Sequence, residues 1–404
     1  MKPITALVVA VVLCVSLALG GCASAPKDGP TADVFVSSAF APPSEPIDSA
    51  RALALSPAMK QFADTEMAAQ VRHKGARAGL IDALYTRGSL QIRYDAEVTR
   101  TASQAFDARR GNCMSLVLMT AAFARYFDIP VQFNSVVVDD TWTRFNGLYF
   151  VTGHVNISLG RPMLAAPPST HGDPSYLTVD FLHPDEVVRQ RSRVIDESMV
   201  VAMYLNNRAA ESLAAGKIDD AYWWAREAIL TDSRWLAAYN TLAVLYRRKG
   251  MHAESVATLR VVLEREPGNT QALSNMILSL RDLGRTEEAD LHASRLAQIQ
   301  PVPPYQLFDE GVAAMRMGAY EKARQLFRRE LARDAYAPEF HFWLGLANYG
   351  LGDLAGAGAE ISKALENSAT TRDRELYGAK LAWLNEVRDQ RRRREPMPQA
   401  RKGS

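Results

Sequence analysis

The chain has 404 residues, of which 48% are hydrophobic and 23% are charged. This length suffices for two or three domains with their own cores, and the composition excludes a largely disordered chain and a protein with many membrane spans. The formal net charge of +2 gives no overall field that would favour nucleic acid, so we expect no nucleic-acid partner. One basic run, 391–394, is either a solvated helix end or a contact for anionic lipid or nucleic acid.

The first 22 residues have the pattern of an export signal. Lys2 precedes the apolar stretch Ile4 to Leu19, which is too short for a comfortable membrane span. The stretch runs into Gly20-Gly21-Cys22, which resembles a bacterial lipobox, where the cysteine thiol takes a lipid. We therefore expect a lipoprotein signal peptide over 1–22 with lipid attached to Cys22. The alternative is a signal peptide cleaved after a small residue, with Cys22 incidental.

The segment after the signal predicts both a tether and a location. Residues 23–49 are rich in Ala, Pro, Ser and Asp, which is typical of a flexible tether. By resemblance to bacterial lipoproteins, Ala23 rather than Asp after the cysteine implies the outer membrane, with the protein facing the periplasm. There Cys113 would be the only free thiol, because Cys14 leaves with the signal and Cys22 is acylated. Such a thiol is either a buried small hydrophobe or kept for its reactivity.

The second half of the chain repeats with a period of 34 residues, which is the period of the tetratricopeptide repeat (TPR). Each unit predicts a helical hairpin whose apolar face is covered only by its neighbours. We expect an α-helical solenoid of five TPR units over 201–366, then a capping helix and basic tail over 367–404. The apolar side of the capping helix would carry Leu376, Leu381, Trp383 and Leu384. The repeated glycines are Gly216, Gly250, Gly284, Gly318 and Gly352.

Arrays of this kind present a groove to a peptide or a partner helix, so we expect a protein partner there. The adjacent Trp223 and Trp224 lie on a predicted helix, where packing between repeats is favoured over a role as ligand platforms. The repeats by themselves do not identify the partner.

Residues 50–200 predict helices followed by a sheet. Apolar residues are spaced by three and four between Ala50 and Arg100, and a second apolar helix begins at Cys113 and ends near Tyr126. Stretches rich in β-branched and aromatic residues follow, separated by turn-rich loops. They predict strands over 131–138, 148–159 and 176–181.

Three residues of this region suit nucleophilic chemistry. A thiol at a helix N-terminus, such as that of Cys113, meets unpaired backbone N–H groups that favour a thiolate and that can hold an oxyanion. The thiol also needs an imidazole to exchange protons and an acceptor that orients the imidazole. His154 and Asp180 fall on consecutive predicted strands, where an antiparallel pairing would make them neighbours.

These residues carry a resemblance. The motif Arg-x-Gly-x-Cys at the start of an apolar helix, then a strand histidine, then an aspartate ending the next strand, resembles the transglutaminase-like branch of the papain fold. The match is narrower to a bacterial subgroup that couples this domain to TPR units. The resemblance implies that Cys113 is the nucleophile, His154 the general base and acid, and Asp180 the orienting carboxylate. Asn156 departs from the pattern, since many members of the family have an aromatic residue there. The matching stretches are Arg109 to Ser115, Trp142, His154-Val155-Asn156 and Val179-Asp180-Phe181.

Other interpretations of the same residues remain open. Cys113 is an inert packed thiol and His154 a satisfied strand histidine if the domain is not catalytic. His183, just before a proline, is a rival base, and a zinc site could combine Cys113 with His154, His171 or His183. Asp139 and Asp140, beside Trp142, indicate a turn. The sequence contains neither a phosphate-binding glycine loop nor a dinucleotide motif, and we expect no cofactor and no metal.

The leading hypothesis is therefore a cysteine-dependent acyl-transfer domain, a protease, amidase or cross-linking transferase, which acts on a peptide or protein substrate that the TPR array helps to recruit. By resemblance, hydrolysis is favoured over cross-linking. The alternative is a non-catalytic periplasmic scaffold with a degenerate papain-like domain.

Overall fold

The computed structural model describes residues 34–86, 90–137, 142–145, 148–151, 153–160, 176–181 and 191–394. The predicted signal peptide, Cys22 and the first part of the predicted tether lie outside these ranges, as do Asp139 and Asp140. Within the described ranges, no helix combines the length and the apolar composition needed to cross a membrane.

The described chain is helical up to residue 126 apart from two short strands, as the sequence predicts. Helix α6 is the centre of this region, because every residue from Met114 to Ala124 is buried. It ends before Asp128, a residue with positive φ that turns the chain toward the sheet. The helical elements are η2 (Ser37–Ala39), η3 (Ser49–Leu53), α2 (Pro57–Phe62), η4 (Ala63–Met67), α3 (Ala68–Lys74), α4 (Ala76–Tyr85), α5 (Ala102–Ala108) and α6 (Cys113–Tyr126).

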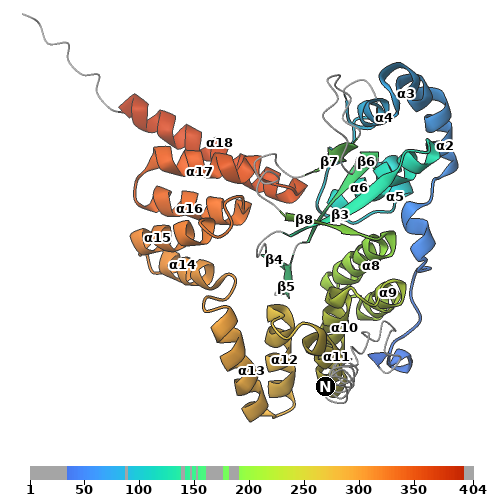
Figure 1. Cartoon of the computed structure of the whole chain (residues 1–404). Helices are drawn as coiled ribbons and strands as arrows, with labels where there is room; N and C mark the ends of the chain where they lie inside the picture. Colours follow the sequence, from blue (N-terminus) through green and yellow to red (C-terminus); the bar gives the residue numbers. More distant parts are fainter. Residues whose placement is uncertain are drawn as a thin grey trace, which may run out of the picture. The chain divides into compact units, whose positions relative to one another are not determined.

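An antiparallel four-stranded sheet packs on α6, with the strand order β7-β6-β3-β8 (Figure 1). The apolar side chains of its central strands join the same core as α6; in β6 these are Val155, Ile157 and Leu159. In register, Phe133 faces Ile157, and Ile157 in turn faces Val179. The strands are β3 (Val131–Val137), β6 (His154–Gly160), β7 (Tyr176–Val179) and β8 (Arg191–Ile195).

The strand prediction was partly wrong. The single strand expected over 148–159 is two strands, β5 (Leu148–Val151) and β6, and β5 pairs with β4 (Trp142–Phe145) in a separate ladder. Gly153 lies between them, and a glycine weakens a strand because it has no side chain to pack. The edge strand β8 was missed, since its polar composition gives no apolar alternation. A short parallel pair, β1 (Arg93–Tyr94) and β2 (Arg110–Gly111), was also missed.

Five helical hairpins follow, at the positions that the 34-residue period predicts (Figure 1). Pro267 and Pro301 lie just beyond the ends of α11 and α13, where a proline cannot continue the helix. The hairpins are α8 (Glu197–Ala214) with α9 (Ile218–Thr231), α10 (Leu236–Arg248) with α11 (His252–Arg265), α12 (Thr270–Asp282) with α13 (Thr286–Ile299), α14 (Gln306–Arg316) with α15 (Tyr320–Leu331), and α16 (Pro338–Gly350) with α17 (Leu354–Glu366).

The repeated glycines form the turn inside each hairpin. All five have φ between +71° and +81°, a left-handed conformation that costs glycine little. The amide after each glycine donates to a carbonyl of the preceding helix, for example from Lys217 to Ser212 at 2.9 Å. Two other small residues allow close helix contact: a Cβ on Gly311 would lie 2.5 Å from Phe327, and one on Gly345 2.7 Å from Ile361.

The core continues across the predicted boundary at residue 200, which lies inside α8. One hydrophobic cluster contains α6, the sheet and the first three hairpins, up to Ala289. Val200 and Leu205 of α8 are fully buried in this cluster. Two separate clusters follow, one around Phe308 and one around Ile361. Helix α8 therefore belongs to the first repeat and to the core of the preceding domain.

The described part of the predicted tether, residues 34–49, packs against the first two hairpins, which its tether-like composition did not predict. Residues 34–53, which we call the N-terminal strap, pack on α9 and α10 through their first part and on α5, α6 and α8 through η3. The Phe40 ring stacks on Tyr222 at 3.9 Å. The Tyr246 hydroxyl accepts from the amide of Val36 and donates to the carbonyl of Val34. The tether-like composition concealed these apolar and backbone contacts.

Helix α18 (Thr371–Arg394) follows the last hairpin, as expected for a capping helix. Its apolar side differs in part from the prediction: Leu384 and Tyr377 are buried against the last hairpin, whereas Leu376 and Trp383 are exposed. The Tyr377 ring stacks on Phe342 at 4.8 Å. Helix α17 therefore meets the face that contains Tyr377 and Leu384.

Candidate active site

Cys113 is the first residue of α6, so the predicted position of the thiol at a helix N-terminus is correct. The Asn112 side chain caps the helix by accepting from the Ser115 amide at 3.0 Å. The first bond within the helix joins the Leu116 amide to the Asn112 carbonyl. The amides of Cys113 and Met114 precede that bond and lack an acceptor inside the helix, so they can receive a negatively charged oxygen.

The segment before the cysteine is tightly fixed. Asn112 donates to the Thr99 hydroxyl at 2.8 Å, and the Arg100 amide donates to the Ser115 hydroxyl at 2.7 Å. Gly111 is buried, and a Cβ there would lie 2.6 Å from that of Ser115. The Arg-x-Gly-x-Cys motif therefore has a local explanation, because only glycine fits directly beside the first turn of the helix.

The structure brings His154 and Asp180 together. His154 begins β6, and Asp180 follows β7, the neighbouring antiparallel strand. The His154 Nε2 atom lies 2.6 Å from Asp180 Oδ1, and only 3% of His154 is exposed. Since Nε2 faces the carboxylate, Nδ1 is the ring nitrogen left for Cys113.

The three predicted residues interact electrostatically. Burial lowers the pKa of His154, but hydrogen bonds to Asp180 and to Cys113 outweigh burial and raise the pKa to about 9. The imidazole therefore holds a second proton at neutral pH. Cys113 itself is partly exposed, so its sulfur is not sealed in the core. The arrangement is a thiol, a charged imidazole and a carboxylate in sequence.

The rival residues lie outside the described part of the chain. His183 and His171 are both in undescribed segments, so neither the alternative base nor the histidines of the zinc hypothesis can be placed. Among the described residues, no three His, Cys, Asp or Glu side chains form a group that could hold a metal ion.

Sequence reasoning missed two buried amides near the carboxylate. Asn156 was noted only as a departure from the family pattern, yet its side chain donates to Asp180 Oδ2 at 2.7 Å. Asn134 on β3 faces Asn156 in register and donates to its Oδ1 at 2.8 Å. The available signal was the alternation in β6, where His154, Asn156 and Ser158 share one face.

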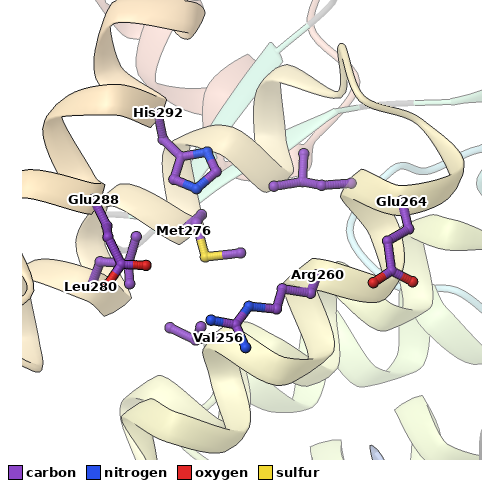
Figure 2. A pocket seen from close by; sticks show the side chains of 8 residues that line it. Val256, Arg260, Glu264, Met276, Leu280, Glu288 and His292 are labelled. Carbon is purple, nitrogen blue, oxygen red and sulfur yellow. The ribbon is translucent and has the colours of Figure 1, made fainter.

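A separate pocket of about 230 Å³ lies among α11, α12 and α13 (Figure 2). Arg260 and His292 approach it from different helices, with Met276 between them (Figure 2). Burial, followed by Arg295, lowers the pKa of His292. The pocket combines charges of both signs with an apolar lining and contains none of the predicted site residues. Its lining is Val256, Arg260, Leu263, Glu264, Met276, Leu280, Glu288 and His292.

Comparison with known proteins identifies the repeats. Tetratricopeptide repeat models match residues 236–269 and 308–370. No curated protein matches the chain. Among solved structures, the chain is similar to a thermophilic TPR protein from Thermus thermophilus, with 19% identity over 45% of this chain and 99% of that one and a TM-score of 0.28.

Two further solved structures give the same kind of match. A tetratricopeptide repeat protein from Parabacteroides merdae is 15% identical over 47% of this chain and 74% of its own, with a TM-score of 0.25. The MamA protein is 17% identical over 43% of this chain and 93% of its own, also with a TM-score of 0.25. The family models confirm TPR units in the C-terminal region, and TPR units are typical of protein-interaction scaffolds.

Proposed function

We propose that residues 50–200 form a transglutaminase-like domain of the papain fold that cleaves or transfers acyl groups of peptide or protein amides. The observations that carry this proposal are the 2.6 Å approach of His154 Nε2 to Asp180 Oδ1 and the electrostatic interaction of His154 with Cys113, which helps to raise the pKa of the imidazole. The order of the elements along the chain, helices followed by an antiparallel sheet, is compatible with this fold. The TPR array would recruit the protein substrate or a partner.

The proposed chemistry follows from the charge on the imidazole. A protonated His154 stabilises a thiolate on Cys113, which attacks the amide carbonyl to form a C–S bond. The amides of Cys113 and Met114 would hold the oxyanion. His154 then gives its proton to the leaving amine as the C–N bond breaks, and later takes a proton from water or a second amine that releases the acyl group. Asp180 keeps Nε2 protonated throughout, so Nδ1 faces the sulfur.

Alkylation of the thiol tests the proposal. At about pH 7, where a free cysteine is mostly protonated, we expect iodoacetamide to modify Cys113 rapidly, because the thiolate is the reactive form. His154→Ala should remove this reactivity. Mass analysis of the Cys113 peptide measures the rate across pH. A wild-type rate that rises only with the ionisation of an ordinary thiol, and that is the same in His154→Ala, would exclude the catalytic function.

The second candidate is a non-catalytic scaffold, which the TPR matches favour. In that case the Cys113 thiol is inert and the first domain serves only as a binding surface. The same alkylation experiment separates the two functions.

We also propose that the chain is a lipoprotein of the bacterial envelope, anchored through Cys22 in the outer membrane and facing the periplasm. The support is the lipobox-like sequence Leu19-Gly20-Gly21-Cys22 with Ala23 after it. Incorporation of labelled palmitate in cells should be lost in Cys22→Ala, and a wild-type chain without label would contradict the anchor.

A further inference from the structure

A row of amide side chains, of which Asn134 and Asn156 are buried, connects the central strands to Asp180. Asn156 donates to Asp180 Oδ2 at 2.7 Å, and Asn134 donates to Asn156 Oδ1 at 2.8 Å and to the Ser158 hydroxyl at 3.0 Å. Gln132 donates to Asn134 Oδ1 at 3.0 Å. Asn134 is 4% exposed and Asn156 is 5% exposed. Each amide therefore donates toward the carboxylate.

Such a row lowers the stability of the fold unless its donors and acceptors are paired. A buried amide loses its bonds to water and regains them only if donors and acceptors are matched. The opposite face of the same strand is entirely apolar, with Val155 and Ile157 in the core. The matched row thus forms a rigid polar network, in which each hydrogen bond fixes the next amide.

The carboxylate of Asp180 is fixed by two donors at different oxygens. His154 Nε2 contacts Oδ1, and Asn156 Nδ2 contacts Oδ2. Two bonds at separate oxygens define the plane of the carboxylate, and the Asn156 amide is the donor that holds Oδ2. If the Asn156 donor were removed, the carboxylate could rotate toward another donor and lengthen its bond to His154.

We propose that Asn156, held in place by Asn134, is a positioning residue that fixes the Asp180 carboxylate and thereby the orientation of the His154 ring. The importance of this orientation for Cys113 rests on the proposed function. The positioning itself can be measured without any catalysis.

The test is an NMR titration of the His154 ring in the full chain, compared between wild type and Asn156→Leu. Leucine has the same branched arrangement of side-chain heavy atoms but cannot donate, so we expect the pKa of His154 to fall by about one unit. We also expect the downfield signal of the Nε2 proton to be lost. An unchanged titration in Asn156→Leu overturns the proposal.

Ser158→Ala is the matched control. It removes another buried hydrogen bond to Asn134 on the same face of β6, but Ser158 does not donate to Asp180. We expect it to lower the unfolding midpoint and to leave the His154 titration unchanged. A shift equal to that of Asn156→Leu would mean that any loss from the network acts on His154, which contradicts a specific role for Asn156.

If Asn156→Leu does not fold, Asn134→Ala tests the same point. The Asn156 amide then loses its donor and can turn, so we expect a smaller fall of the His154 pKa, and no fall overturns the proposal. Alkylation of Cys113 separates this inference from the proposed function. An inert thiol with an Asn-dependent His154 titration ends the enzyme hypothesis alone, whereas a reactive thiol with an Asn-independent titration ends the positioning role alone.

Discussion

The charge on the buried His154 ring depends on Asp180 and Cys113, and this gives the folded state a pH dependence. The pKa rises from 6.5 to about 9, so the charged ring stabilises the fold fully below about pH 6.5, and this contribution is lost as pH rises through about 9. We therefore expect the difference in free energy of unfolding between wild type and His154→Gln to shrink over that range. Urea unfolding at several pH values measures it.

The raised pKa of His154 also limits how large this difference in free energy of unfolding can be. A shift of this kind corresponds to about 3 kcal/mol at most. Comparing both proteins in a Cys113→Ser background removes the titration of the thiol, and the part that remains is due to Asp180. A difference that stays constant from pH 6 to about pH 9 would contradict the raised pKa.

At the residue scale, sequence order was enough to select Cys113, His154 and Asp180, because a helix start and two consecutive strands constrain where they meet. The partners of Asp180 were not predictable in the same way. Asn134 is 22 residues from Asn156, and only the register of β3 with β6 places them opposite each other. The alternation in β6 places Asn156 on the face of His154, but its pairing with Asn134 is a consequence of strand register that no local pattern encodes.

Among the elements, the N-terminal strap offers a direct test. The Tyr246 hydroxyl accepts a hydrogen bond from the Val36 amide and donates one to the Val34 carbonyl. Tyr246→Phe leaves both backbone groups without the hydroxyl. We therefore expect the free energy of unfolding to fall by about 1–3 kcal/mol and proteolysis within residues 34–45 to become faster. Limited proteolysis followed by mass analysis measures the cleavage.

Tyr204→Phe is the control for this prediction. Tyr204 is a buried tyrosine of α8 whose edge contact with Trp224 does not need the hydroxyl. We expect its cleavage pattern to equal that of wild type. Equal rates in Tyr246→Phe and wild type would mean that other contacts, such as the Phe40 stack on Tyr222 and the Ser44 bonds to Asp220, hold the strap without the hydroxyl.

Elements with a strong period were predictable, and those defined by long-range contacts were not. The hairpins follow from glycines repeated every 34 residues, each of which turns the chain locally. The strap resembles a tether in composition because many of its contacts use backbone groups and small polar side chains such as Ser44, which bonds to Asp220. The polar edge strand β8 exists only because β3 is beside it.

For the whole molecule, the continuous core around α8 predicts how the chain unfolds. One apolar cluster joins α6, the sheet and the first three hairpins, and Glu211 of α8 accepts from the Thr99 amide at 2.7 Å. The last two hairpins have separate, smaller clusters. Repeats with separate cores open more independently than repeats that share one.

Amide hydrogen exchange resolves this prediction by segment. We expect α6 and α9 to exchange with the same free energy of opening, because exposing either one exposes the shared core. Amides of α14 to α17 should open with a free energy lower by about 1–3 kcal/mol, since their apolar contacts lie in the smaller clusters. The paired test is truncation. A chain ending at 299 should keep α6 protected, whereas one ending at 196 should lose that protection, because α8 completes the core. Protected α6 amides in the shorter chain would mean that residues before 197 form a core of their own.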